Sequence, residues 1–145
     1  MSISQIITKA AASVGITLTL SKTSEEKLNN AGTMEFASDS LKLLSQNEIA
    51  DSLCILTDGV ARFSRSAGDR ALEFATVKAA FTPLGISGLN SPGRYMSDIT
   101  LDAGSAYIRF SLKKWNDLIY ADPTLGARLR GWWTATHAVA GLARR

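Results

Sequence analysis

Residues 51–63 read Asp51-Ser52-Leu53-Cys54-Ile55-Leu56-Thr57-Asp58-Gly59-Val60-Ala61-Arg62-Phe63. They contain two apolar runs of strand length, 53–56 and 60–63, with Thr57-Asp58-Gly59 between them. An Asp-Gly pair readily adopts the positive φ that a tight turn requires, so the pattern predicts a β-hairpin.

The same rhythm continues on both sides of this stretch. Further apolar runs of strand length lie at 41–44, 72–77, 99–101 and 106–110, separated by polar residues or glycine. Ser66-Ala67-Gly68-Asp69 predicts a second turn, because Gly and Asp tolerate the backbone angles of tight turns. This spacing indicates an all-β core.

Helical spacing precedes the strands. Apolar residues at helical intervals over 3–14 predict an amphipathic helix that Gly15 ends. A second helix is expected at about 24–32, capped by Thr23 or Ser24 and stopped by a glycine.

Helical spacing also follows the strands. The apolar residues of 112–119 share one face of a short helix, and Asp122-Pro123 starts another, because Asp caps helices and Pro suits the first helical position. We therefore expect an N-terminal extension at 1–22 and a domain at 23–145, whose C-terminal helices span about 112–143.

Composition excludes several classes of protein. With 145 residues, 46% hydrophobic, the chain can bury the core of one globular domain. A net charge of +3 lacks the strong basic bias of nucleic-acid binders, so no nucleic-acid partner is expected. The apolar stretch at 10–20 is too short for a membrane span. The lone Cys54, in an apolar run, predicts a buried thiol and a cytoplasmic location.

The stretch 81–98 is the most unusual part of the sequence, with three glycines and two prolines. Exposed backbone N–H groups in such a loop can form an anion-binding nest, and Arg94 can supply the charge partner for a phosphate. The alternative is a plain surface loop.

The order of these elements resembles the cyclic nucleotide-binding domain. The resemblance is carried by Ser24-Glu25-Glu26-Lys27-Leu28, Phe36-Ala37-Ser38-Asp39, the 51–63 stretch and Ser105 to Leu125. It implies a mainly β fold with flanking helices: an antiparallel β-roll (a jelly roll, or double-stranded β-helix) with N-terminal helices and two C-terminal helices.

The resemblance also implies a ligand site, with cyclic AMP or cyclic GMP as ligand or another anionic small molecule in its place. The residues that it implies are Gly85, Ser87, Arg94, Tyr95 and Ser97. Ile86 falls where the family has a Glu that binds the ribose hydroxyl, and an unpaired hydroxyl costs roughly 1–3 kcal/mol. Tyr95 and Met96 replace small residues, and Pro92-Gly93-Arg94-Tyr95 is similar to a divergent branch without that Glu. Weak or lost nucleotide binding is the expectation.

Catalysis is not expected. The only histidine, His137, lies among Ala, Thr and Val on the last helix, and no nucleophile or carboxylate pair accompanies it. Gly85-Ile86-Ser87-Gly88 is one residue short of a nucleophile elbow. No group of Cys, His and carboxylates has metal-ligand spacing, so neither a metal nor a cofactor is predicted.

Two functions stay open at this stage. The first is a stand-alone regulatory or adaptor module. The second is a structural or assembly protein that forms a homodimer or docks a protein partner through its terminal helices. Trp132 and Trp133 are about 100° apart on the helix, so one can pack on the roll while the other anchors a partner; both can also be core. The sequence leaves open whether 1–22 packs on the roll or reaches another protein.

Overall fold

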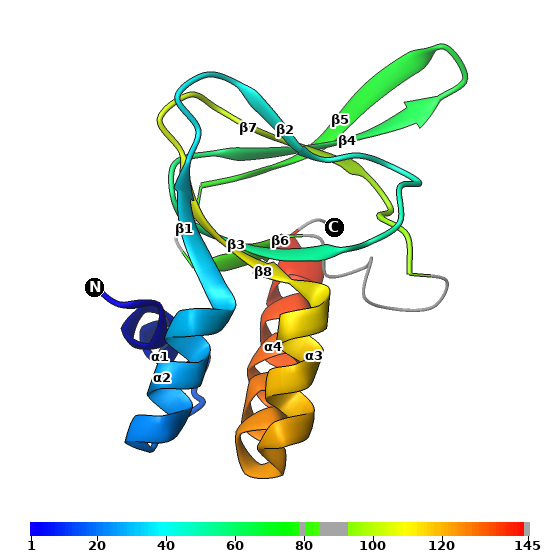
Figure 1. The fold of residues 1–145 in the computed structure, drawn as a ribbon. Coiled ribbons are helices and arrows are strands. Elements are labelled where there is room, and N and C mark those ends of the chain that lie inside the picture. Colours follow the sequence, from blue (N-terminus) through cyan, green and yellow to red (C-terminus); the bar gives the residue numbers. More distant parts are fainter. Residues whose placement is uncertain (79–80, 85–92, 144–145) are drawn as a thin grey trace.

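The structure, a computed structural model, describes residues 1–78, 81–84 and 93–143 and contains two antiparallel four-stranded sheets (Figure 1). The first sheet has the order β1-β8-β3-β6 and the second β2-β7-β4-β5. The strands are β1 (Gly32–Phe36), β2 (Leu41–Leu44), β3 (Ser52–Asp58), β4 (Ala61–Ala67), β5 (Arg70–Val77), β6 (Thr82–Leu84), β7 (Asp98–Leu101) and β8 (Ala106–Ser111). The predicted antiparallel β-roll with flanking helices is confirmed.

The predicted hairpin at Thr57-Asp58-Gly59 is wrong. β3 pairs with β6 and β8, whereas β4 pairs with β5 and β7 of the other sheet. Gly59, at φ +101°, turns a corner between the sheets, and the Val60 N–H donates to Ser105 Oγ at 3.1 Å. Asp-Gly supplies a positive φ to a corner as readily as to a hairpin, so the local signal cannot separate them.

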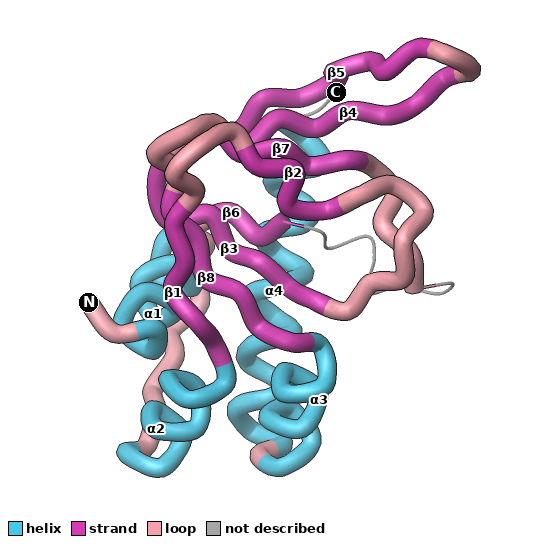
Figure 2. Tube along the Cα trace, turned by 45° about the horizontal axis from the view of Figure 1, so that its top comes forward, coloured by secondary structure: helices cyan, strands magenta, loops and turns pink. Residues whose placement is uncertain are grey.

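The second predicted turn is a true hairpin. Ala67 pairs with Arg70 across it, and Gly68 has φ +65°. Figure 2 shows the β4–β5 hairpin extending beyond the rest of the roll.

Two strands lay outside the apolar runs that the sequence singled out. β1 begins directly after the second helix, at Gly32, and only its last residue, Phe36, belongs to the stretch Phe36–Asp39 on which the resemblance relied. β6 contains Pro83, which lacks a backbone N–H; it is tolerated because β6 is the edge strand of its sheet.

Four helices lie on the outer side of the first sheet (Figure 1). They are α1 (Ile3–Ser13), α2 (Lys22–Ala31), α3 (Leu112–Ala121) and α4 (Pro123–Ala143). The N-cap of α2 is Ser21, whose side chain accepts the Ser24 N–H, and not Thr23 or Ser24 as predicted. Asp122 accepts the Leu125 N–H at 3.1 Å, as its predicted capping role at α4 requires.

The molecule has two apolar clusters. The helical cluster joins α1, α3 and α4 to the outer side of the first sheet, with Ile7, Ile108, Leu129 and Trp132 fully buried in it. Residues 1–22 therefore pack on the domain, which answers the question that the sequence left open. None of the helices in the described residues combines the length and apolarity needed to cross a membrane.

The second cluster fills the roll between the sheets. It includes Cys54, which is buried as predicted, together with Leu56, Phe63 and Leu101. Burial away from water raises the pKa of the Cys54 thiol to about 12, so the thiol stays protonated at neutral pH. Packed side chains from both sheets therefore fill the interior of the roll.

Candidate functional site

The segment Gly93–Ser97, called here the cassette segment, carries three of the predicted ligand-binding residues. Its backbone is bonded to the loop between β2 and β3. The Asn47 N–H donates to the Tyr95 carbonyl at 2.8 Å, the Tyr95 N–H to the Glu48 carbonyl at 3.1 Å, and the Ala50 N–H to the Gly93 carbonyl at 2.8 Å. These bonds hold the segment in place from within the chain.

Tyr95 points into the roll. Its side chain is only 4% exposed and belongs to the apolar cluster between the sheets. Its hydroxyl accepts the Ser52 N–H at 3.1 Å and donates to the Ser52 carbonyl at 2.9 Å. Burial raises the pKa of this phenol, which keeps it a donor. Tyr95 thus joins the cassette segment to β3 through the interior.

Arg94 lies on the opposite side of the segment. Its side chain is exposed, and its Nη1 donates to the Asn47 carbonyl at 2.7 Å. Asn47 presents that carbonyl from a left-handed backbone, φ +69°, which asparagine tolerates better than most residues. In this structure the Arg94 guanidinium therefore binds the chain on the outer surface rather than reaching into the roll.

The arginine that faces the interior is Arg109, which the sequence analysis did not select. On β8 it shares the roll-facing side with Tyr107, and its guanidinium carbon lies 5.9 Å from the centre of that ring. Its Nε donates to Glu35 Oε2 at 2.9 Å and its Nη1 to Ser52 Oγ at 3.1 Å. The sequence did contain a signal for Arg109, because it is a charged residue in the otherwise apolar run 106–110. Its partner could not be predicted, since Glu35 lies far away in sequence.

The remaining predicted ligand residues divide into two groups. Ser97 is buried at the end of the cassette segment. Gly85 and Ser87, with the departure at Ile86, lie outside the described residues. The structure thus brings together Arg94, Tyr95 and Ser97 and says nothing of the glycine part of the predicted cradle.

Trp132 is fully buried in the helical cluster. Its side chain is not available to a partner in this structure, so the partner-binding assignment does not fit it and the core interpretation does. The side chain of Trp133 lies outside what the structure describes.

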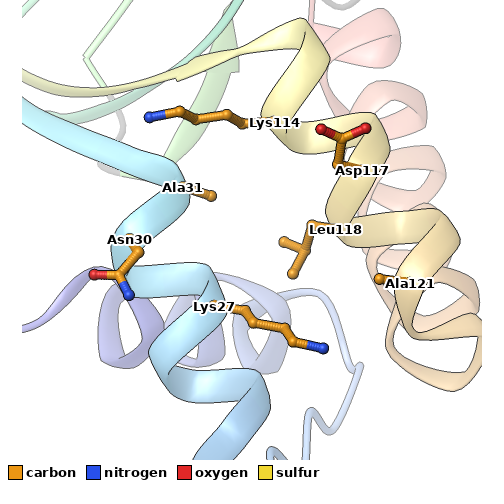
Figure 3. A pocket seen from close by; sticks show the side chains of 7 residues that line it. All are labelled: Lys27, Asn30, Ala31, Lys114, Asp117, Leu118 and Ala121. Atoms are coloured by element: carbon orange, nitrogen blue, oxygen red, sulfur yellow. The ribbon is translucent and has the colours of Figure 1, made fainter.

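A groove with ligand-sized space lies between α2 and α3. This groove, of about 340 Å³, is lined by Lys27, Asn30, Ala31, Lys114, Asp117, Leu118 and Ala121. Figure 3 shows Lys27 and Lys114 extending from the two helices toward the space between them. The residues 114, 117, 118 and 121 form one face of α3, so helical spacing was a signal for the stripe but not for its neighbour α2.

The described residues contain no group of three or more His, Cys, Asp or Glu side chains arranged to hold a metal ion. Among these residues, the side chains around Tyr95 form a hydrogen-bonded chain from Glu35 through Arg109 and Ser52 to the cassette segment. These bonds connect β1, β8 and β3 to the cassette segment.

The Tyr95 hydroxyl gives a first testable expectation. Tyr95→Phe should lower the free energy of unfolding by about 1–3 kcal/mol, because the buried N–H and carbonyl of Ser52 lose a partner each. Urea unfolding measures this. Tyr120→Phe, at an exposed tyrosine of α3, is the matched control and should change little. Equal effects at both tyrosines would contradict the buried hydrogen bonds.

Comparisons with known proteins give matches in structure only. No protein-family model and no curated protein matches the chain. A cyclic nucleotide-binding domain from Methylobacillus flagellatus KT has a TM-score of 0.82 at 13% identity, covering 97% of this chain and 79% of that one.

Two further solved structures have similar folds. The sensor domain of the transcriptional regulator DNR from Pseudomonas aeruginosa has a TM-score of 0.65 at 14% identity, covering 86% of this chain and 88% of that one. The regulatory domain of Toxoplasma gondii PKA, crystallised with cAMP, has a TM-score of 0.64 at 12% identity, covering 80% of this chain and 42% of that one. At 12% to 14% identity, these likenesses show the fold.

Proposed function

We propose that this chain, which has the fold of cyclic nucleotide-binding domains, is a non-enzymatic cytoplasmic regulatory or adaptor module with weak or lost affinity for cyclic nucleotides. The observation that carries the proposal is Tyr95. Its phenol lies inside the roll and bonds to Ser52. A side chain of the protein itself therefore occupies this part of the interior.

The charges around the roll support the same conclusion. A cyclic phosphate is an anion and binds best where a cation is free to approach it. Arg94 is on the outer surface, and the interior Arg109 is already paired with Glu35 at 2.9 Å. A nucleotide inside the roll would therefore be out of reach of the Arg94 guanidinium as it lies here, and its phosphate would have to compete with Glu35 for Arg109.

The assembly alternative relied on the terminal helices. Among the side chains that the structure describes, the large apolar ones of α1 and α4, such as Ile7 and Trp132, are packed in the helical cluster of the same chain. The exposed large apolar side chains of the described residues lie mainly on strands and loops. These observations favour an adaptor that presents another surface.

Calorimetric titration of the full chain with cyclic AMP and cyclic GMP tests the proposal. We expect no saturable heat at millimolar ligand, which corresponds to a binding free energy weaker than about 4 kcal/mol. Arg94→Ala and the matched control Lys113→Ala should give the same result, with folding checked by circular dichroism.

Two outcomes would overturn the proposal. Saturable binding that Arg94→Ala abolishes and Lys113→Ala keeps would make the chain an ordinary nucleotide sensor. Saturable binding that survives in both variants would place a working nucleotide site elsewhere in the roll.

A further inference from the structure

The β4–β5 hairpin and the cassette segment share an exposed apolar surface. Large apolar side chains that are between 42% and 69% exposed occur here on three parts of the chain: Ile49 in the loop between β2 and β3, Leu72 and Phe74 on β5, and Met96 in the cassette segment. Soluble proteins seldom leave such side chains grouped without a binding role. We define the hairpin face as Ile49, Arg65, Leu72, Phe74, Arg94 and Met96.

Direct contacts make the hairpin face continuous. The Arg65 Nε donates to the Met96 carbonyl at 3.1 Å, and its guanidinium carbon lies 5.1 Å from the centre of the Phe74 ring. Arg65 is also paired with Leu72 across the hairpin. These contacts link β4 and β5 to the cassette segment.

The backbone pairing of Ile49 with Arg94 places the other end of the hairpin face. Ile49 forms an isolated antiparallel bridge with Arg94, so their side chains lie on one side of it. Met96 follows Arg94 by two residues and is exposed as well, whereas the intervening Tyr95 points inward. The exposed residues of the face therefore connect Ile49, through the cassette segment and Arg65, to Phe74.

The two arginines of the face carry charge that no carboxylate offsets. In the part of the chain that the structure describes, which includes all 13 Asp and Glu residues, neither Arg65 nor Arg94 has a carboxylate within ion-pair distance. Each donates to a backbone carbonyl instead. Arg62 of the same hairpin, by contrast, is paired with Asp102 at 2.8 Å and Glu73 at 3.7 Å.

The hairpin face borders an open sheet edge. β5 is the last strand of its sheet, and in the described residues β4 is the only strand that pairs with it. Its outer backbone N–H and carbonyl groups can therefore pair with an added strand. Figure 2 shows this edge standing clear of the helices.

We propose that the hairpin face docks an extended segment of another protein in which carboxylates and apolar side chains take turns at every second residue, so that both kinds lie on the same face of the added strand. The segment pairs with the edge of β5, its apolar side chains cover Leu72 and Phe74, and its carboxylates reach Arg65 and Arg94. Positive charge on the face and apolar area beside it select this chemistry together. The proposal names the partner of the adaptor role above and rests on it.

Fluorescence anisotropy with defined peptides tests the docking. The probe is a short labelled peptide in which Glu and Leu or Phe take turns at every second residue, with Thr at the residues between them, and its counterpart has Lys in place of Glu. We expect the full chain to bind the Glu peptide only, and salt to weaken the binding by screening the arginines. Arg65→Glu and Phe74→Ser should each lower affinity by about tenfold or more, which is the loss of one anchor contact.

Matched controls lie on α3. Lys113→Glu reverses an exposed charge and Tyr120→Ser removes an exposed aromatic ring, and both should bind the Glu peptide like the unmodified chain. Equal binding of the Lys peptide, or equal loss in the control variants, would overturn the proposal. No binding of the Glu peptide would overturn it too.

Two other occupants are separate outcomes. If sedimentation shows self-association that Phe74→Ser abolishes, the face binds a second copy of the chain instead. If vesicles of anionic lipid bind and Arg65→Glu prevents it, the occupant is a membrane surface. The nucleotide titration probes the roll interior and the peptide titration probes the hairpin face, so a failure of either proposal can be distinguished from a failure of the other.

Discussion

Gly59→Ala should lower the free energy of unfolding by about 3 kcal/mol or more, combining backbone strain with overlap. Gly59 has φ +101°, a conformation that side-chain-bearing residues rarely adopt, and an added Cβ would lie 2.6 Å from Ser105 Cα and 2.7 Å from its Cβ. Ser105 is fully buried and held by bonds at this corner, so it cannot move aside at low cost. Urea unfolding of the unmodified chain and of the variant measures the loss, provided that the two share the same dependence of unfolding free energy on urea concentration.

Gly68→Ala is the control for the corner. Gly68 also has a positive φ, +65°, but an added Cβ there would meet nothing within 4 Å. Only the left-handed backbone penalty applies, about 1–2 kcal/mol. If the two substitutions cost the same, the close packing of Ser105 against Gly59 is not what fixes the corner between the sheets.

Trp132→Ala should cost about 3–5 kcal/mol, the usual range for deleting a large buried aromatic side chain. Trp132 is fully buried in the cluster that joins α4 to α1 and to the first sheet, so its removal leaves a cavity where these elements meet. Thermal or urea unfolding followed by circular dichroism provides the measurement.

Tyr120→Ala is the matched control for Trp132. Tyr120 is 76% exposed on α3, and its truncation should stay within about 0.5 kcal/mol, as for surface substitutions in general. A loss below about 1 kcal/mol for Trp132→Ala would mean that this ring is not a core residue. The sequence-based idea of Trp132 as a partner anchor would then return.

Most elements of the fold could be predicted from sequence. The apolar runs at 41–44 and 106–110 became β2 and β8 almost unchanged, and Asp122-Pro123 starts α4 as its capping chemistry requires. These features depend on the spacing of apolar residues and on contacts between near neighbours, which the chain carries locally. The order of elements also sufficed for the resemblance to a β-roll domain.

The candidate site was predictable only as a region. The sequence predicted both Arg94 and Tyr95 as ligand-binding residues. The structure places Arg94 outside the roll and Tyr95 inside it. Successive residues of an extended segment face opposite sides, so a shift of one residue exchanges inward and outward positions. Backbone hydrogen bonds from the cassette segment to Asn47, Glu48 and Ala50 determine which of its residues face inward. The local sequence gives no indication of these bonds.

The sequence by itself determined the kinds and order of the elements other than β1 and β6, the positive-φ turns at Gly59 and Gly68, and the buried thiol. Only the tertiary structure decided that Gly59 joins two sheets, that Arg109 pairs with Glu35 on the roll-facing side of the first sheet, and that residues 1–22 share a core with Trp132. The physical reason is range. Turns and helices follow from sterics and hydrogen bonds within a few residues, whereas strand partners are selected by the burial of whole faces brought together from distant parts of the chain.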